Sequence, residues 1–522
     1  MPYKAAFAGL LLLAPLTVTA EPRFSPVPLP EHIYSGGWEH FVGGGVAVFD
    51  CNGDDLPEAF LAGGSAPAML LKNTTKGHGA AIRFEKATPK SLALEGVTGA
   101  YPLDIDGDGT LDLAVLRVGE NRLMRGLGNC RFEPMGKAFG FESDPEGWTT
   151  AFSATWEEGA TLPTLAFGNY VDRADPKGPF GTCAPGALYR QDGAGYGTPL
   201  PLAPAYCPLS MLFSDWSRTG RQDLRVSNDR HYYVKGGQEQ LWAMEPTPRL
   251  YTEEDGWKPY ALWGMGIATR DMTGDGRQEV YLTSMGDQKF QALAEGAQGP
   301  VYEDAHFDSG TTAHRPYVGD DGRPSTGWHV AFGDVQNDGR DDIFVAKGNV
   351  EQMPGAAMED PNNLLVQQAD GRFTEHGATA GIATVERSRG AALVDLNLDG
   401  LLDLIVVNRR AAAEAYQNTS DAPGNWAMVA LRHPAPNTRA VGAFAEIRAG
   451  GRTHLREITV GGGHAGGDAV PLHIGLGMAT QADLRVIWPD GAVSDWVDLP
   501  VNALTRVTRN GADAALLLAP GG

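Results

Sequence analysis

Short apolar runs of strand length alternate with acidic, glycine-containing nonapeptides between residues 50 and 403. After each nonapeptide, apolar residues recur at every second position, as at Leu113 and Val115. This alternation is typical of a β-strand with one buried face, so each nonapeptide is predicted to join two strands. The 68 glycines and 35 prolines favour many short strands linked by turns. The pattern therefore predicts an all-β protein.

Six copies of the nonapeptide begin at positions 50, 104, 215, 271, 334 and 395, which lie 54, 111, 56, 63 and 61 residues apart. The double-length gap predicts a degenerate copy at residues 156–164, followed by a strand at 165–168. Seven units of roughly 50–60 residues match propeller blades of four strands. We expect a seven-bladed β-propeller over residues 21–420 and a small C-terminal β domain over residues 421–515.

Oxygen-bearing side chains stand at most of positions 1, 3, 5 and 9 of the nonapeptide, and the carbonyl of position 7 can add another oxygen. This donor set suits a hard divalent cation such as calcium. The 18 carboxylates at these positions would repel one another without a cation, so several structural calcium ions are predicted. The predicted metal ligands are Asp50, Asn52, Asp54, Leu56, Glu58, Asp104, Asp106, Asp108, Thr110, Asp112, Asp215, Ser217, Thr219, Arg221, Asp223, Asp271, Thr273, Asp275, Arg277, Glu279, Asp334, Gln336, Asp338, Arg340, Asp342, Asp395, Asn397, Asp399, Leu401 and Asp403.

The six copies differ in their donors. The copy that begins at Asp104 keeps four aspartates and is expected to bind calcium best. The copy that begins at Asp215 has two carboxylates beside Arg218 and Arg221, and is expected to be weak or empty. An EF-hand needs a glutamate at position 12 and helices on both sides, but position 12 is apolar in every copy. The nonapeptides are therefore interpreted as strand–loop–strand hairpins.

The N-terminus is typical of a secretory signal peptide over residues 1–20. Lys4 precedes an apolar run, and small residues before Glu21 predict cleavage near Ala20. No later stretch has the ~20 apolar residues of a membrane-spanning helix. The net charge of −22 argues against nucleic acid as a partner. The mature protein is expected to be secreted or periplasmic, and the sequence does not indicate its oligomeric state.

Four cysteines in an exported chain permit two disulfides. Cys183 and Cys207 lie in one Pro/Gly-rich insertion over residues 172–208 and are the favoured pair, which leaves Cys51 and Cys130. Four cysteines allow three connectivities, and the sequence does not choose among them. A zinc site is the alternative, although no Cys-x-x-Cys motif occurs.

The acidic hairpins resemble the FG-GAP (VCBS) repeats of the integrin α-chain propeller, and the whole chain resembles bacterial relatives of cartilage acidic protein. The segments Leu472–Gly477 and Trp488–Gly491 resemble the ASPIC/UnbV domain, as do the earlier pairs Gly442-Ala443 and Gly450-Gly451. The resemblance implies a ring closed by a strand from the other terminus, for which residues 38–42 are a candidate. Many relatives carry Ser-Gln where Gly466 and Gly467 stand, and these glycines are expected to form a loose turn.

The sequence contains no His-Glu-x-x-His motif, nucleophile elbow or Cys-His arrangement. We therefore expect a calcium-binding interaction module that presents loops to a protein or glycan partner outside the cytoplasm, and the insertion at residues 172–208 is one candidate loop. The alternative is a carbohydrate-active lyase or hydrolase with its site at the propeller axis. Such a site would need a deep pocket that holds two or more of the residues His306, His314, His329, Glu303 and Asp320.

Overall fold

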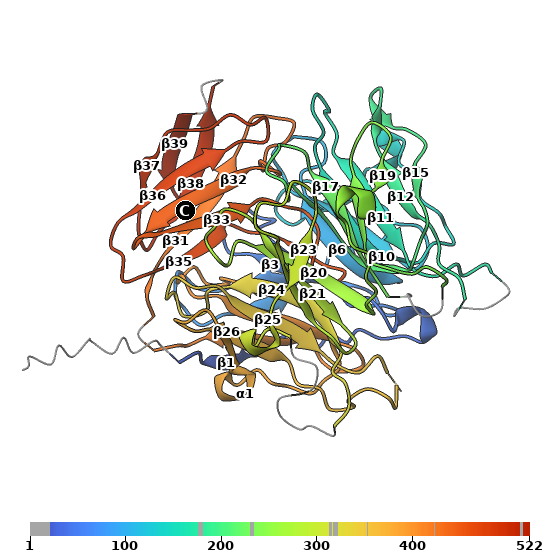
Figure 1. Cartoon of the computed structure of the whole chain (residues 1–522), viewed down its shortest axis with the longest axis horizontal. Coiled ribbons are helices and arrows are strands. Elements are labelled where there is room, and N and C mark those ends of the chain that lie inside the picture. Colours follow the sequence, from blue (N-terminus) through green and yellow to red (C-terminus); the bar gives the residue numbers. More distant parts are fainter. Residues whose placement is uncertain are drawn as a thin grey trace, which may run out of the picture.

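The computed structural model describes residues 21–175, 181–229, 234–312, 316, 322–351, 353–421, 423–511 and 515–521. The predicted signal peptide lies outside the described residues, as do His314 and Asp320. Strands dominate the fold, and the predicted all-β, propeller-like architecture is confirmed (Figure 1). The helices in the described part of the chain are all too short to span a bilayer.

Seven sheets with four propeller strands each surround a common axis in the described residues. The first strands of neighbouring sheets contact one another in a cycle that closes from β28 to β2, so these strands are innermost. From the inner strand outward, the sheets are β2 (Val46–Phe49), β3 (Glu58–Leu61), β4 (Met69–Asn73) and β5 (Phe84–Lys86); β6 (Val97–Leu103), β7 (Asp112–Arg117), β8 (Arg122–Gly126) and β9 (Phe132–Pro134); β10 (Thr149–Thr155), β11 (Thr164–Asn169), β12 (Gly186–Tyr189) and β15 (Leu200–Leu202); β16 (Pro208–Ser214), β17 (Asp223–Asn228), β18 (Gln240–Ala243) and β19 (Arg249–Leu250); β20 (Gly264–Arg270), β21 (Glu279–Ser284), β22 (Lys289–Leu293) and β23 (Tyr302–Asp304); β24 (Gly327–Gly333), β25 (Asp342–Lys347), β26 (Asn363–Gln367) and β27 (Phe373–Glu375); and β28 (Ser388–Val394), β29 (Asp403–Asn408), β30 (Glu414–Asn418) and β1 (Phe24–Val27).

Short elements decorate the ring outside these sheets. They are the hairpin of β13 (Gln191–Asp192) and β14 (Gly195–Tyr196), the 3-10 helices η1 (Trp38–His40), η2 (Gly136–Phe139), η3 (Glu253–Asp255) and η4 (Phe307–Ser309), and the helix α1 (Gly377–Ala380). The degenerate copy at residues 156–164 joins β10 to β11, as the repeat spacing predicts.

The ring is closed by β1, which pairs antiparallel with β30 from Phe24 opposite Asn418 to Val27 opposite Ala415. The N-terminal strand is the fourth strand of the last sheet, which therefore has as many propeller strands as its neighbours. The expectation that residues 38–42 form the closing strand is wrong. Trp38 belongs to the 3-10 helix η1, where its ring stacks on Phe41 at 4.8 Å and both rings contact Trp148. Trp38 and Phe41 therefore pack through their aromatic side chains and do not pair as part of a strand.

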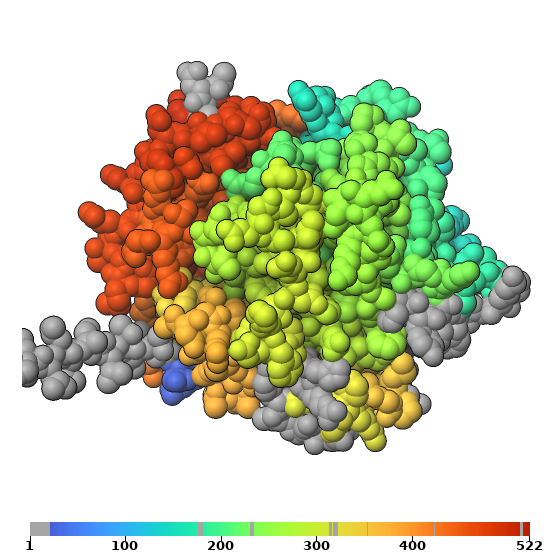
Figure 2. All heavy atoms as spheres, in the orientation of Figure 1, coloured from blue at the N-terminus to red at the C-terminus, as the bar shows by residue number. Residues whose placement is uncertain are grey.

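The C-terminal domain is a sandwich of two sheets around its own apolar core, which includes Val429, Ile447 and Trp488. Figure 1 shows its strands, orange to red, beside the ring, and Figure 2 shows the two parts in direct contact. One sheet has the order β35-β31-β38-β39 and the other β33-β32-β36-β37. Their bounds are β31 (Asn425–Arg432), β32 (Phe444–Ala449), β33 (Arg452–Glu457), β35 (Leu472–Gly477), β36 (Ala482–Ile487), β37 (Val497–Leu499), β38 (Leu504–Asn510) and β39 (Ala515–Pro520).

A glycine-rich segment of this domain, residues 460–469, enters the centre of the ring; we call it the axial loop. Its backbone bridges the inner strands β10, β16, β20 and β6 in turn, and its last part, β34 (Asp468–Ala469), pairs parallel with β2. The N–H groups of Gly462 and Gly463 each donate to an inner-strand carbonyl at 2.7 Å. One loop thereby hydrogen-bonds to five of the seven sheets.

The axial loop needs glycine because backbone lies against backbone at the axis. A Cβ atom on Gly466 would lie 2.2 Å from the carbonyl oxygen of Val46. On the ring side, Cβ atoms on Gly45 and Gly99 would lie 1.8 and 1.7 Å from the carbonyl oxygen of Ala465. The expectation that Gly466 and Gly467 form a loose turn is therefore wrong, because this segment is packed more closely than a side chain permits.

Replacing Gly99 with alanine tests this packing. Because the new methyl group would overlap the carbonyl of Ala465, Gly99→Ala is expected to lower the free energy of unfolding in urea by about 2 kcal/mol or more. Gly355→Ala is the matched control, since a Cβ atom there meets nothing within 4 Å, and it should change stability by less than about 0.5 kcal/mol. Equal stabilities of the two variants would contradict the position of the axial loop.

Candidate metal centres

Each acidic nonapeptide joins the first and second strands of one sheet, so the strand–loop–strand interpretation is confirmed. The carboxylate at position 1 accepts backbone N–H groups from later positions and folds the loop around itself. Asp104 accepts from Gly107 at 3.0 Å and from Gly109 at 2.8 Å. Asp395 likewise accepts from Gly400 at 2.7 Å. The loops are therefore built as closed turns around the first carboxylate.

Positions 5 and 9 are oriented by the same kind of bond in five of the six loops, all but the one at Asp215. The position-9 carboxylate accepts the backbone N–H of position 2, and the position-5 carboxylate accepts that of position 7. For position 9, the donor–acceptor pairs are Cys51 to Glu58, Ile105 to Asp112, Met272 to Glu279, Val335 to Asp342 and Leu396 to Asp403. For position 5, they are Leu56 to Asp54, Thr110 to Asp108, Arg277 to Asp275, Arg340 to Asp338 and Leu401 to Asp399.

The second loop has the densest set of acidic groups. Carboxylate oxygens of Asp104, Asp106 and Asp108 all lie within 4.8 Å of one another, and Asp112 is fully buried beside them. Three carboxylates at this separation form a strongly negative pocket. Hard divalent cations are bound by oxygen atoms of this kind.

Two position-3 side chains present buried oxygens without a hydrogen-bond donor. In the described part of the structure, Gln336 Oε1 and Asn397 Oδ1 have no partner, although both residues are almost completely buried. An oxygen in this state is costly unless something else satisfies it. The amide nitrogen of Asn397 donates to Asp399 at 3.0 Å, which leaves the oxygen directed elsewhere. A cation in the loop would satisfy such an oxygen.

The loop at Asp215 is balanced by an arginine instead. Arg221, at position 7, donates from Nε to the buried carboxylate of Asp223 at 2.8 Å. The hydroxyl of Tyr251 donates to the same carboxylate at 2.7 Å. Arg218 lies over the ring of Phe444 and reaches Glu446 at 3.6 Å. This loop already contains its positive charge, and the expectation that it binds calcium weakly or not at all stays a prediction.

Burial raises the pKa values of the loop carboxylates well above their ordinary range. It raises the pKa of Glu58, Asp112 and Asp334 to about 8, and neighbouring carboxylates of the same loop add to each shift. The pKa values of Glu279 and Asp395 rise to about 7 for the same reasons. Without a cation, the folded chain would therefore hold protons on these groups at neutral pH.

The C-terminal domain covers the acidic loops. The hydroxyl of Thr438 donates to Asp104, and Arg456 forms a buried ion pair with Asp341 at 2.8 Å. Further contacts extend this interface to other loops. They are Arg506 with Asp55 at 2.5 Å, Arg452 with the carbonyl of Gly339 at 2.8 Å, His473 with the carbonyl of Gly400 at 2.9 Å, and the N–H of Asp215 with Glu457 at 2.8 Å.

At the centre of the ring, His464 of the axial loop is fully buried. Its Nε2 accepts the backbone N–H of Gly43 at 3.2 Å, and its Nδ1 lies 3.1 Å from the carbonyl oxygen of Met265. Its own N–H donates to Nδ1 of His329 at 3.0 Å. Burial lowers the pKa of His464 to about 3 and that of His329 to about 4, so both rings stay neutral. These histidines join the axial loop to the ring.

The residues proposed for an enzyme site at the propeller axis do not lie together, as far as the structure describes them. His329 lies at the axis, whereas Glu303 is exposed on the outer strand β23 and His306 is exposed just after it. The axis itself is filled by the axial loop and by the aromatic cluster around Trp148 and Trp328. These positions leave no acid–base pair assembled from the predicted set within the described residues.

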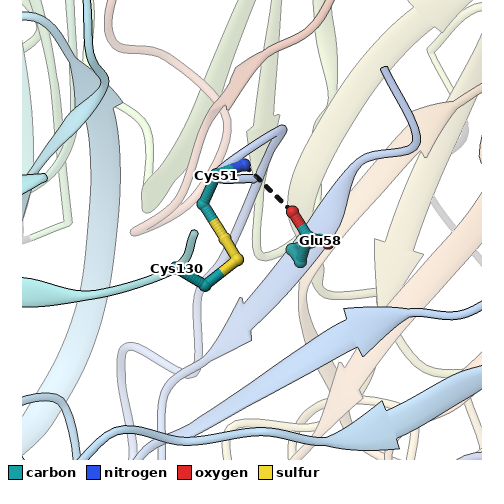
Figure 3. A group of neighbouring side chains, drawn as sticks. All are labelled: Cys51, Glu58 and Cys130. Carbon is teal, nitrogen blue, oxygen red and sulfur yellow. Dashed lines mark hydrogen bonds between the residues drawn. A yellow bond between two sulfur atoms is a disulfide. The ribbon is translucent and has the colours of Figure 1, made fainter. Parts of the chain in front are cut away.

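Both cysteine pairs are disulfides, Cys51 with Cys130 and Cys183 with Cys207, so the zinc alternative is wrong. Figure 3 shows the first disulfide beside Glu58, which accepts the N–H of Cys51 at 2.9 Å. The bond joins the first acidic loop to the turn between β8 and β9 of the next sheet. Two disulfides are typical of proteins outside the cytoplasm.

The sequence analysis missed the side chains of the C-terminal domain that contact the loops. Thr438, Arg452, Arg456 and Arg506 are separated from their partners by more than 100 residues. No local motif marks them. The only signal was a group of arginines in one domain of a strongly acidic chain, which indicates attraction but no specific pairing.

Comparison with known proteins identifies the C-terminal domain. Residues 433–514 match the family model described as ASPIC and UnbV. The predicted resemblance of this UnbV-like domain is thus confirmed. Cartilage acidic protein 1 of Mus musculus is 29% identical over 162 residues, which cover 30% of this chain and 23% of that protein. The Homo sapiens protein is 28% identical over 162 residues, which cover 30% of this chain and 22% of that protein. The match spans less than a quarter of either relative.

Three solved structures match this chain with TM-scores below 0.5. BBS1N in complex with ARL6DN gives a TM-score of 0.44 at 10% identity, covering 77% of this chain and 99% of that chain. The BP39L lectin from Burkholderia pseudomallei gives a TM-score of 0.44 at 10% identity, covering 74% of this chain and 98% of that chain. An N-acetylglucosamine-specific lectin from Agrocybe aegerita gives a TM-score of 0.37 at 15% identity, covering 69% of this chain and 89% of that chain.

The raised pKa values predict how stability depends on pH after chelation. Between the unfolded pKa near 4 and folded values of about 7 to 8, the folded chain binds more protons, so stability falls as pH rises through this window. The melting temperature of chelator-treated protein should fall by more than about 5 °C between pH 5.5 and pH 8. Excess calcium should abolish most of that fall. Parallel curves with and without calcium would refute this explanation.

Proposed function

We propose that this protein is an exported, calcium-loaded propeller that acts as a binding module outside the cytoplasm. The observation that carries the calcium assignment is the pair of buried, donor-free oxygens at Gln336 and Asn397, at the same loop position. Clustered carboxylates with raised pKa values in the same set of loops support it. Calcium, with six to eight oxygen ligands, suits loops that offer carboxylates, amide oxygens and backbone carbonyls.

The proposed role of calcium is structural. The loops lie beneath the UnbV-like domain, so each ion would neutralise carboxylates on the ring side of a buried interface. Arg456 and Arg506 balance other carboxylates in the same loops, Asp341 and Asp55. Removing the ions would leave like charges facing one another at this interface. Calcium would therefore stabilise both the hairpins and the attachment of the domain.

Export is part of the same proposal. Signal-peptide cleavage near Ala20 would leave Glu21 as the first residue, just before the closing strand β1. The two disulfides are compatible with an oxidising compartment. The periplasm or the extracellular medium also supplies calcium at concentrations that fill sites of this class.

The partner is proposed to be a protein or glycan that docks on rim loops, since the axis is filled. Residues 172–208 are not a single inserted loop, because they contain the sheet strands β12 and β15. The candidate surface there is the β13–β14 hairpin between these strands, and the Cys183–Cys207 disulfide ties together the segments before β12 and after β15, which limits the entropy that binding would cost. Phe307 of η4 is 81% exposed and offers an apolar anchor elsewhere on the rim. The lectin titles among the similar structures belong to those proteins and do not choose between the two partner types.

The calcium assignment predicts a stoichiometry. Five loops, at residues 50, 104, 271, 334 and 395, should give about five calcium ions per chain by elemental analysis of purified protein. Asp108→Asn removes one carboxylate ligand and should lower the count by one and the melting temperature by about 2–4 °C. Asp215→Asn is the matched control, because the carboxylates of that loop are already satisfied by arginine and backbone donors.

The Asp215→Asn control should leave the calcium content unchanged. Fewer than about three ions per chain in the unmodified protein would contradict the assignment of the loops. Equal losses of calcium in the two variants would show that the metal is not bound at the individual hairpins.

A further inference from the structure

A cavity of about 590 Å³ lies between the ring and the UnbV-like domain. Its walls come from the inner strands β6, β20 and β24, from β31 and β33 of the domain, and from the axial loop. We call it the interface chamber. Its volume falls within the range of small-molecule sites in proteins. The apolar part of its lining includes Leu212, Ile267 and Leu455.

Two opposite charges face the interface chamber without forming an ion pair with each other. Arg270, at the end of β20, donates to the carbonyl of Phe332 at 3.3 Å, but its Nε has no hydrogen-bond partner in the described structure. Asp468, on the axial loop, is an exposed residue that lines the same chamber, and Arg270 attracts it electrostatically. The protein around it raises the pKa of Asp468 to about 6.

The remaining charges of the chamber include arginines without an ion pair. Arg456 and Arg506 are paired with Asp341 and Asp55. Arg432 and Arg439 donate only to the backbone carbonyls of Leu431 and Gly109 in the described structure. The acidic residues Asp50, Asp104 and Glu457 also line the chamber, and Asp50 and Asp104 belong to the candidate calcium loops. The guanidinium groups of Arg270, Arg432 and Arg439 thus line the chamber without an ion pair to a described residue.

A guanidinium in an enclosed space is stable only if an anion balances it, because the charge has lost most of its water. Arginine presents two parallel N–H groups that match the oxygens of a carboxylate or a phosphate. A carboxylate such as Asp468 accepts hydrogen bonds and matches a hydroxyl group. The two side chains together select a molecule that carries an oxyanion at one end and hydroxyl groups at the other.

We propose that the interface chamber is a binding site for a small polyhydroxylated organic anion, with its oxyanion on Arg270 and a hydroxyl group on Asp468. A sugar acid and a sugar phosphate share this chemistry and differ only in the oxyanion. Arg432 and Arg439 also line the chamber and add positive charge there. This site goes beyond the rim surface proposed above, because it lies inside the molecule and takes a small molecule instead of a protein or glycan chain.

The test uses the full-length, calcium-loaded protein and isothermal titration calorimetry. The probes are D-glucuronate and glucose 1-phosphate for the two oxyanions, methyl α-glucoside as a neutral sugar, and inorganic phosphate. At least one of the two sugar anions should bind saturably, and at least 10-fold more tightly than the neutral sugar and inorganic phosphate. Arg270→Gln should weaken that binding at least 10-fold. Asp468→Asn should reduce the preference for the sugar anion over inorganic phosphate.

Arg372→Gln is the matched control, since the side chain of this arginine is 61% exposed and does not line the chamber. It should bind the probes like the unmodified protein. Melting temperature and calcium content are measured first for each variant, because Arg270 adjoins Asp271 of a candidate loop. If Arg270→Gln does not fold, Arg270→Lys, which keeps the charge but loses the fork of donors, should still weaken binding several-fold.

Binding of neither sugar anion at millimolar concentration would overturn the proposal. Undiminished binding by the folded Arg270 variants would also overturn it. Tighter binding of inorganic phosphate than of either sugar anion would identify an adventitious ion only. None of these outcomes depends on the rim partner, and a normal calcium content in the same samples would leave the proposed function intact.

Discussion

Carboxylates buried at the ends of inner strands are the constraint on which the rest of the structure depends. Each hairpin brings acidic groups such as Asp104 and Asp112 into positions that burial makes unfavourable for a negative charge. A cation, an arginine or a proton has to balance them. The loop at Asp215 shows the arginine solution, because Arg221 pairs with Asp223 inside the loop. In three of the other five loops an arginine pairs with a carboxylate at position 3 or 5, as Arg277 does with Asp275, but in the described residues none pairs with the position-9 carboxylate, so we propose a cation for these loops.

The second organising feature is the axial loop, which makes the ring and the UnbV-like domain parts of one structure. Its backbone pairs with five inner strands, and His464 is held by groups from Gly43 and Met265 on different sheets. A ring can be closed at its rim by one strand, as β1 does here, but the axis of this ring is filled by a segment from the next domain. The proposed calcium ions beneath that domain and the loop within the axis would therefore stabilise the same interface.

Local features of the fold could be predicted from the sequence, whereas long-range contacts could not. Alternating residues such as Leu113 and Val115 specify a strand on their own, and the repeated nonapeptide specifies the hairpin before it. The closing strand was misplaced because its pairing, Phe24 with Asn418, joins residues almost 400 positions apart. Gly466 was assigned to a loose turn because a glycine-rich segment has the same composition whether it is exposed or packed against backbone.

The candidate metal loops could likewise be predicted from the sequence, but not their long-range contacts. The spacing of oxygen-bearing residues located the hairpin loops, and Arg218 and Arg221 in the sequence marked the loop at Asp215 as different from the others. The contacts made by Thr438, Arg456 and Arg506 depend on how two domains pack, and no local pattern encodes them. The interface chamber is likewise formed by many separate parts of the chain, from Asp50 to Arg506.

Anomalous diffraction at long wavelength, from crystals grown with calcium, tests the central claim most directly. The account predicts five anomalous peaks, each surrounded by the position-1, position-3 and position-5 oxygens of one hairpin, and none at the loop that begins at Asp215. Hairpins whose carboxylates surround only water, or peaks confined to the protein surface, would contradict it.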